Sequence, residues 1–485
     1  MVFSSPIFLF VFLPAVLLGS VLPSLRMRNL WLLGFSLLFY AWGEAAFVFL
    51  MLGSTLLNYF LGQWVDRETD TGRRRWIAGL AIGLNLGLLA FFKYANFAVE
   101  NLNWVLTSAG AAPVRAAAIR LPIGISFFTF HALSYVIDIY RRKWPSAKSP
   151  TDVALYIFFF PQLIAGPILR WNAIAPQIAD RTQTAERFAQ GVRRFVEGLA
   201  KKILLANVVA VPADQIFKIS ANGQDLRPAV AWLGALCYML QIYFDFSGYS
   251  DMAIGLGKMF GFEFMENFNY PYVSESIRDF WRRWHISLSS WFRDYLYFPL
   301  GGNRCSNTRN HLNLLIVFFL CGLWHGASWT FVVWGLYHGF FIVLEHAGFG
   351  RVLGRVARPL RHFYALLVVL VGWVVFRAPT LSDALAFLAN MMGITRAVVA
   401  ARPLESLLTH QVVCAVIAGL ALSTPLWPWL KQRGARVVET LPQALGTAAR
   451  TTGALAHVLL IIALLLISAA WLAGGTYNPF IYFRF

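Results

Sequence analysis

Long apolar stretches recur from one end of the chain to the other, separated by short polar segments. A helix that crosses a membrane needs roughly 20 such residues, because it rises about 1.5 Å per residue through a hydrocarbon core about 30 Å thick. At that length the 485 residues accommodate about ten to twelve crossings. The clearest candidates lie near residues 6–22, 76–94, 152–168, 228–246, 312–335, 363–377, 411–428 and 454–473.

Two further apolar stretches predict less regular elements. Residues 30–62 are too long for one crossing, so we expect two helices that turn near Gly43 and Glu44. Residues 121–140 contain Pro122 and Gly124 near their start, which predicts either a crossing or a re-entrant segment. Irregular backbone at membrane depth is tolerated only where protein or a water-filled cavity covers it.

The pattern changes between residues 247 and 311, where no clean run of twenty apolar residues occurs. In SIRDFWRRWHISLSSWFRDYLYFPLGG, tryptophans alternate with arginines, which is typical of an amphipathic helix that lies at the membrane interface. We find no internal repeat of the kind that marks many secondary transporters. The segment therefore predicts interfacial helices and disfavours a transporter.

Composition excludes a soluble globular enzyme. Apolar residues make up 58% of the chain and charged residues 13%, against about 45–50% and about 25% in soluble domains. The first apolar run has no positive residue before it and continues into a basic loop, so we interpret it as a membrane helix that is retained rather than a cleaved signal peptide.

The net charge of +18 would suggest nucleic-acid binding in a soluble domain, but the positions of the basic residues argue otherwise. They cluster in short segments between apolar runs, as cytoplasmic loops of membrane proteins do, and no motif for reading bases accompanies them. We therefore expect no nucleic-acid partner. The clusters are Arg26 and Arg28; 73–75; 141–143; Arg193, Arg194, Lys201 and Lys202; Arg351, Arg355, Arg358 and Arg361; and Lys431, Arg433 and Arg436.

No metal site or disulfide framework is predicted. The four cysteines lie far apart without a C-x-x-C pair. His338 follows His325 by thirteen residues, which is about 220° around an ideal helix, so the two do not share a face.

His325 is the most suggestive histidine, because it lies within the apolar stretch LLIVFFLCGLWHGASWTF. A neutral imidazole can accept a proton from an attacking hydroxyl near neutral pH. If the segment is one helix, Cys321, Gly322, Ser328 and Trp329 share its face. Two interpretations of Gly322 and Gly326 remain open: they allow close helix packing, or they open a cavity for a substrate.

Acidic and amide side chains near the middle of the chain also need partners. Asp245 comes directly after an apolar run and Asp251 follows six residues later. Carboxylates at such depth require a counter-charge or a wet cavity. A structural ion pair is favoured over a proton relay, with Arg282, Arg283 or Arg293 as the expected partners. Asn267 and Asn269 lie close to Pro271, where they would satisfy freed backbone groups.

The segment TYNPFIYFRF, residues 476–485, is rich in aromatic residues. An aromatic belt at the interface explains this composition. A tyrosine hydroxyl such as that of Tyr482 would alternatively serve as an acyl acceptor.

Four stretches together resemble the membrane-bound O-acyltransferase family, in particular its bacterial alginate O-acetylation branch. They are PQLIAGPILRW (161–171), YFDFSGYSDMAIGLGKMFGFEFMENFNYPY (243–272), DFWRRWHISLSSWFRDYLYFPLGGNR (279–304) and GLWHGASWTFVVWGLYHG (322–339). The resemblance implies an all-α polytopic fold, with re-entrant and interfacial helices around a central tunnel. It also implies one domain over residues 1–485, with a catalytic core over about 120–345 and an aromatic tail over 476–485.

The resemblance further implies roles for individual residues. His325 matches the catalytic histidine of the family's WHG motif, His285 matches the histidine of the RWHxSLS motif, and Tyr482 matches the tyrosine of a FIYFxF motif that relays the acyl group in related systems. The residues we expect to bind substrate are Asp245, Asn267, Asn269, Arg282, Arg283, Trp324 and Trp329.

The implied activity is transfer of an acetyl group from a cytoplasmic donor, acetyl-CoA, to an extracytoplasmic polysaccharide such as alginate. Acetyl-CoA would be a substrate, and no bound cofactor is expected. The expected location is a bacterial inner membrane. The expected partners are a periplasmic SGNH-type acetyltransferase and the polysaccharide-secretion machinery. The alternatives are a non-catalytic export or scaffold component, a peptidoglycan O-acetyltransferase and a teichoic-acid D-alanylation enzyme.

Overall fold

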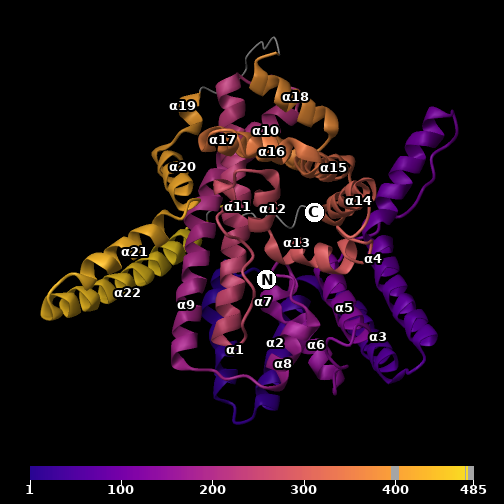
Figure 1. Ribbon diagram of the computed structural model, residues 1–485, viewed down its shortest axis with the longest axis horizontal. Helices are drawn as coiled ribbons and strands as arrows, with labels where there is room; N and C mark the ends of the chain where they lie inside the picture. Colours follow the sequence, from indigo (N-terminus) through magenta and orange to yellow (C-terminus); the bar gives the residue numbers. More distant parts are fainter. Residues whose placement is uncertain (395–403, 476, 479–485) are drawn as a thin grey trace.

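The computed structural model describes residues 1–394, 404–475, 477 and 478, and within them every regular element is a helix (Figure 1). The expectation of an all-α membrane protein is thus confirmed. In these residues seven helices, or eight if one bent pair is counted, are long and apolar enough to span a membrane. The expected number of ten to twelve crossings is therefore not confirmed.

The seven long candidate spans are α3 (Phe47–Arg67), α4 (Thr71–Ser108), the α9-to-α10 unit (Ala185–Ala221), α11 (Pro228–Met259), the α15-to-α16 unit (Trp329–Leu353), α17 (Arg358–Arg377) and α22 (Gln443–Ala473). The bent pair consists of α20 (His410–Leu422) and α21 (Leu426–Glu439), which meet at 64°. Shorter apolar helices are the first unit (Phe8–Val21, including α1, Leu13–Leu17), α5 (Ile125–Tyr140) and α18 (Leu381–Met392).

The remaining helices complete the fold around these spans. They are α2 (Leu25–Glu44), α6 (Pro150–Phe158), α7 (Phe160–Leu163), α8 (Trp171–Ala179), α12 (Ile277–Arg283), α13 (Ile286–Phe292), the following turn η5 (Arg293–Tyr297), α14 (Asn307–His325) and α19 (Leu404–Leu407).

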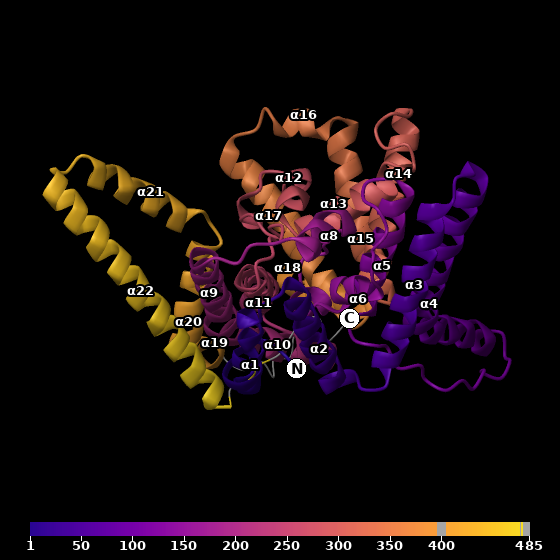
Figure 2. The same cartoon turned by 90° about the horizontal axis from the view of Figure 1, so that it is seen from below.

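Several basic clusters gather along one edge of the molecule. Figure 2 shows the junction between α3 and α4, the short helix α16 (Gly350–Leu353) and the junction between α21 and α22 along its upper edge. Residues 73–75, the arginines around α16 and the basic residues of α21 belong to these segments. Because basic loops remain in the cytoplasm, we assign this edge to the cytoplasmic side.

Helix breaks occur where the chain contains glycine or proline, and protein covers them. Residues 30–62 form α2 and α3 with a turn just after Glu44, as expected. α5 begins after Gly124, whose φ of 78° lies in the left-handed region that glycine adopts at little cost. A Cβ atom there would lie 3.0 Å from the carbonyl oxygen of Leu163, so the break is packed against α7.

The expectation of one helix over 312–335 is wrong. α14 ends at His325, and α15 (Trp329–Leu344) begins after three intervening residues, of which Gly326 is in an extended conformation. The two helices then pack with their backbones in contact, because a Cβ at Gly322 would collide with the carbonyl of Phe331 and a Cβ at Gly335 with that of Phe318. Gly322 therefore serves close helix packing, the first of the two interpretations.

The tryptophan- and arginine-rich segment is not an interfacial helix, contrary to its pattern. Its two short helices, α12 and α13, leave Arg278 and Arg282 exposed but turn their apolar faces into the protein, where Phe280 and Leu288 are almost completely buried. Aromatic rings of other helices surround them: Trp284 lies 4.8 Å from Trp373 of α17, and Trp281 lies 5.8 Å from Trp334 of α15, between ring centroids. The apolar face that would have met lipid meets these rings instead.

Helices α9 (Ala185–Ala200) and α11 approach each other through glycines spaced seven residues apart. A Cβ on Gly198 would lie 2.5 Å from the carbonyl oxygen of Gly248, and one on Gly191 would lie 2.6 Å from that of Gly255. Small residues at such spacing let two membrane helices bring their backbones together.

The close approach of α9 and α11 also pairs the carboxylates of α11. Asp245 lies 2.8 Å from Lys202, and both side chains are almost completely buried. Asp251 lies 2.7 Å from Arg194 and 2.6 Å from Lys201. The expectation of ion pairs is therefore confirmed, but the expected partners are wrong.

The expected arginines pair with carboxylates of their own neighbourhood. Arg283 binds Asp279 at 3.0 Å, and Arg293 binds Asp294 at 2.8 Å. The reason for the difference is that α9 and the turn η3 (Lys201–Ala206) that continues it lie beside α11 and bring Arg194, Lys201 and Lys202 to its carboxylates.

We predict that Gly198→Ala lowers the stability of the protein by about 1–3 kcal/mol, because the added methyl group forces α9 away from α11. The midpoint of thermal unfolding of the detergent-purified protein measures this. The matched control is Gly83→Ala on α4, where an added Cβ meets nothing within 4 Å. Equal midpoints for the two variants would contradict the proposed packing.

Candidate active site

His325 is the last residue of α14, and it is enclosed by aromatic rings. Its imidazole centroid lies 5.1 Å from Trp324, 5.0 Å from Trp334 and 5.3 Å from Phe376. Only 6% of the residue is exposed, and its Nδ1 has no hydrogen-bond partner among the described residues. The ring is thus held by packing while a nitrogen remains available for proton transfer.

His285 lies between α12 and α13 in a backbone conformation that is rare for any residue except glycine. Its φ of 46° and ψ of 54° fall in the left-handed region, where non-glycine residues store strain and are enriched at functional sites. The side chain is completely buried, and its ring centroid lies 4.6 Å from that of Phe246. The surrounding fold therefore imposes this conformation on His285.

Asn267 orients His285. The Asn267 side-chain oxygen accepts hydrogen bonds from the backbone N–H and the hydroxyl of Ser287, at 3.2 and 2.8 Å, and lies 3.2 Å from His285 Nδ1. Because an amide oxygen only accepts, His285 Nδ1 carries the proton, and Nε2 of the neutral ring is an acceptor. His285 Nε2 has no partner among the described residues.

The role of Asn267 was only partly predicted. It does satisfy backbone N–H groups, as its position before Pro271 suggested, but it also fixes the tautomer of His285. The backbone of this segment supports the arrangement: Asn267 accepts from the N–H of Ile286 at 2.9 Å, and Asn269 donates to the carbonyl of Arg283 at 2.9 Å.

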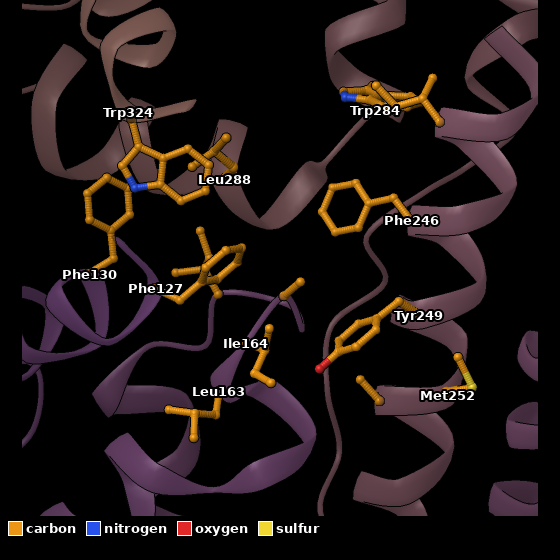
Figure 3. Close-up of a cluster of buried hydrophobic side chains, with 14 of the residues drawn as sticks. Phe127, Phe130, Leu163, Ile164, Phe246, Tyr249, Met252, Trp284, Leu288 and Trp324 are labelled. Atoms are coloured by element: carbon orange, nitrogen blue, oxygen red, sulfur yellow. The ribbon is translucent and has the colours of Figure 1, made fainter. Parts of the chain in front are cut away.

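Trp324 links the two histidines. Its ring centroid lies 5.1 Å from that of His325 and 6.2 Å from that of His285. Figure 3 shows Trp324 together with Phe127 and Phe130 of α5, from which its ring centroid is 5.3 and 5.4 Å away. The indole thus forms an apolar wall beside both imidazoles.

A cavity of about 220 Å³ adjoins His325. It is lined by His325, Trp324, Lys93, Ile164 and the segment from Leu121 to Phe127. Lys93 was not among the residues predicted from the sequence. As a single lysine within the apolar run 76–94, it could have been predicted to be functional, because an ionisable group at membrane depth is costly.

A second, larger cavity of about 520 Å³ lies along the preceding part of α14. Its lining includes Leu314, Phe318 and Cys321 of α14, and Leu288 of α13. Cys321 is one helical turn before His325. The two cavities therefore meet successive stretches of α14 near His325.

Arginines line the larger cavity. Arg278, Arg282 and Arg293 belong to its walls, and neither Arg278 nor Arg282 forms an ion pair with another described residue. Guanidinium groups without a carboxylate partner are suited to bind phosphate. α12, which carries the first two, is held at its start by the buried carboxylate of Glu345, which accepts from the N–H groups of Ile277 and Arg278 at 2.7 and 3.0 Å.

Arg293 is neutralised by its neighbour in the chain, unlike the other two arginines. Burial alone would raise the pKa of Asp294, but the hydrogen bond from Arg293 and the charge of Arg170 outweigh it and hold that pKa below its usual value. Arg170 lies 2.6 Å from Asp294. Arg278 and Arg282 are therefore the free cations of this cavity within the described residues.

The other predicted binding residues do not gather at His325. Trp329 is 55% exposed, and its indole N–H donates to Asn101 at 2.9 Å. Asp245 pairs with Lys202, Asn269 is exposed, and Arg283 pairs with Asp279. Among the described residues no group of three histidine, cysteine or carboxylate side chains is placed to hold a metal ion.

Tyr482 lies outside the described residues, but the chain shortly before it is anchored. The hydroxyl of Tyr477 donates to Asp214 at 2.8 Å. The Asn478 side chain donates to the carbonyl of Ser4 at 2.8 Å and accepts from Asn207 at 3.1 Å.

Comparison with known proteins identifies relatives of this chain. It is 42% identical to "Probable alginate O-acetylase AlgI" of Azotobacter vinelandii, over 100% of both chains. It is 48% identical to the protein of the same name from Pseudomonas aeruginosa, over 79% of this chain and 73% of that one. It is 36% identical to "Peptidoglycan O-acetyltransferase" of Helicobacter pylori, over 81% and 80%.

The sequence profile of the membrane-bound O-acyltransferase family matches residues 129–382. This range includes both histidines, Asn267 and the whole of the larger cavity. The motifs, the helical membrane fold and the relatives agree, and the chain is a member of the membrane-bound O-acyltransferase family and an O-acyltransferase.

Proposed function

We propose that this protein moves an acetyl group from cytoplasmic acetyl-CoA to an extracytoplasmic polysaccharide, with alginate as the first candidate. The observation that carries the proposal is that His325 lines one cavity at the end of α14, while a second cavity lined by arginines reaches Cys321, one helical turn before it. One cavity suits a donor and the other an acceptor. An acyl group can thus change carriers at the histidine without either carrier crossing the membrane.

The larger cavity is the proposed donor site. Its unpaired Arg278 and Arg282 would bind the phosphates of a coenzyme A thioester, and its apolar floor along α14 suits the pantetheine arm. α12 and α14 appear near the basic upper edge in Figure 2, which we assigned to the cytoplasm. This agrees with a donor that is made in the cytoplasm.

At the reaction centre, His325 would accept the proton of the attacking hydroxyl. The hydroxyl oxygen then forms a bond to the thioester carbonyl carbon, the carbon–sulfur bond breaks, and the coenzyme A thiolate leaves with the proton from His325. The rings around His325 keep water from the thioester, which protects it from hydrolysis.

His285 would act beside His325 as the second imidazole of the centre. Its Nδ1–H is held by Asn267, so its Nε2 is kept in a defined orientation. As an acceptor in the neutral ring, this nitrogen would receive a hydrogen bond from the substrate and orient it beside His325.

Tyr482 would serve as the intermediate acceptor. Its support is the match of residues 480–485 to the FIYFxF motif, and Asn478, four residues before Tyr482, is anchored by Ser4 and Asn207. In this scheme the tyrosine oxygen carries the acetyl group until a second hydroxyl attacks the ester and the tyrosine recovers its proton.

The names of the relatives favour alginate as the final acceptor, and the Helicobacter pylori relative makes peptidoglycan the second candidate. Family membership argues against a purely non-catalytic scaffold. The proposed setting is the bacterial inner membrane, and a periplasmic SGNH-type acetyltransferase linked to the secretion machinery would receive the acetyl group.

His325→Ala should lower acetyl transfer from acetyl-CoA at least about 100-fold, because no other group replaces the proton acceptor. Release of coenzyme A by purified protein and O-acetyl content of the secreted polysaccharide measure the effect. His457→Ala on the outer helix α22 is the control and should behave as the wild type. Normal acetylation by His325→Ala would contradict the assignment.

Arg282→Gln should raise KM for acetyl-CoA roughly tenfold and leave kcat unchanged, because a charge-assisted hydrogen bond to phosphate is lost. Titration of the donor in the same coenzyme A release assay measures both constants. Arg433→Gln on α21 is the control. A loss in kcat alone would show that this cavity does not bind the donor.

Tyr482→Phe should abolish the acetylated intermediate, because the phenol oxygen that carries it is absent. Mass spectrometry of the peptide that contains residue 482, after incubation with labelled acetyl-CoA, detects the ester in the wild type. Tyr59→Phe on α3 is the control. Unchanged polysaccharide acetylation in Tyr482→Phe would leave this tyrosine as an interfacial anchor.

A further inference from the structure

α14 ends inside the protein, directly at the proposed catalytic histidine, and this creates a requirement for hydrogen bonds. The last four carbonyl groups of an α-helix have no partner within the helix. In α14 these belong to the residues from Gly322 to His325. Away from water, each unpaired carbonyl would cost free energy, so the surrounding protein must supply donors.

Two of the four carbonyls are satisfied by Gly326 and by Tyr94. The N–H of Gly326 donates to the carbonyl of Gly322 at 3.3 Å. The hydroxyl of Tyr94 on α4 donates to the carbonyl of Leu323 at 2.8 Å.

Lys93, the neighbour of Tyr94, satisfies the other two. Its ammonium group donates to the carbonyl of Trp324 and to that of His325, the latter at 3.3 Å. It also donates to the hydroxyl of Ser126 at 3.0 Å. The three N–H groups of Lys93 thus all bind neutral oxygens, and two of them bind the end of α14.

The charge of Lys93 strengthens this contact. The C-terminal end of a helix carries a partial negative charge, which attracts a cation. Lys93 is only 8% exposed, so solvent screens the attraction little. A lysine that would otherwise be costly at this depth is therefore balanced by the helix end that it binds.

We infer that Lys93 and Tyr94 are positioning residues that hold the last turn of α14 and thereby fix the imidazole of His325 at the wall of the smaller cavity. Their own atoms donate to carbonyl groups, so they act through His325 rather than on the substrate. The inference rests on the proposed role of His325. It adds that catalysis requires two side chains of α4, a helix that lies outside the residues 129–382 matched by the family profile.

The test uses the full-length protein with three substitutions: Lys93→Met, Lys93→Gln and Tyr94→Phe. Lys93→Met should lower kcat for acetyl transfer on the order of 100-fold, because small displacements of a reacting group have effects of this size. KM for acetyl-CoA should not change, because the donor cavity does not include Lys93. Lys93→Gln keeps N–H donors and should recover most of kcat, and Tyr94→Phe should show a smaller loss.

Hydrogen–deuterium exchange provides a readout that does not depend on activity. In Lys93→Met, the amides of residues 323–328 should exchange faster, while those of α22 exchange at the wild-type rate. Lys431→Met on the exposed helix α21 is the control and should leave exchange in both regions unchanged.

The inference is overturned if Lys93→Met keeps wild-type kcat, if Lys93→Gln fails to recover activity, or if exchange at residues 323–328 does not change. If wild-type protein does not turn over acetyl-CoA, the proposed function fails instead. Exchange at residues 323–328 then decides the role of Lys93 and Tyr94 on its own.

Discussion

Backbone polar groups that leave a helix within a membrane must find partners in the protein, and this constraint organises the centre of the molecule. The backbone is irregular at the reaction centre of the acyltransferase, because α14 ends at His325 and Gly326 is extended. Two breaks are paired with a specific donor or acceptor: Asn267 accepts at the start of α13, and α4 donates to the end of α14. At the break near Gly124, α7 packs against the backbone. The outer helices make these internal contacts possible by excluding lipid.

The scarce charges divide into two groups with different tasks. Asp245 with Lys202, and Asp251 with Arg194 and Lys201, are paired at the interface of α9 and α11. Buried pairs of this kind contribute little net stability, but the loss of one partner is costly, so they fix which helices are neighbours. Lys93 and Arg282 form no ion pair with other described residues and line the two cavities. Lys93 is committed to the end of α14, whereas Arg282 is left available where the phosphates of a thioester donor would bind.

Close packing and catalysis are linked along α14. Gly322 brings α14 and α15 into backbone contact, which lets Trp334 of α15 approach His325. The glycines thus contribute to the site indirectly, by bringing aromatic rings against the imidazole. Those rings restrict the orientation of His325 and lower the access of water, and both effects favour transfer of an acyl group over its hydrolysis.

The sequence by itself determined the helical membrane class, the break near Gly43 and Glu44, the break at Gly124, and the prominence of His325 and His285. These features depend on local composition and on motifs that are continuous in the chain. Only the tertiary structure decided that α14 stops at His325, that Asp245 pairs with Lys202, that the apolar faces of α12 and α13 are buried, and that Lys93 contacts the carbonyl of a residue more than 200 positions away. The physical reason is that a carbonyl, a carboxylate or an apolar face specifies only that it needs a partner. Which partner it meets depends on how the helices pack.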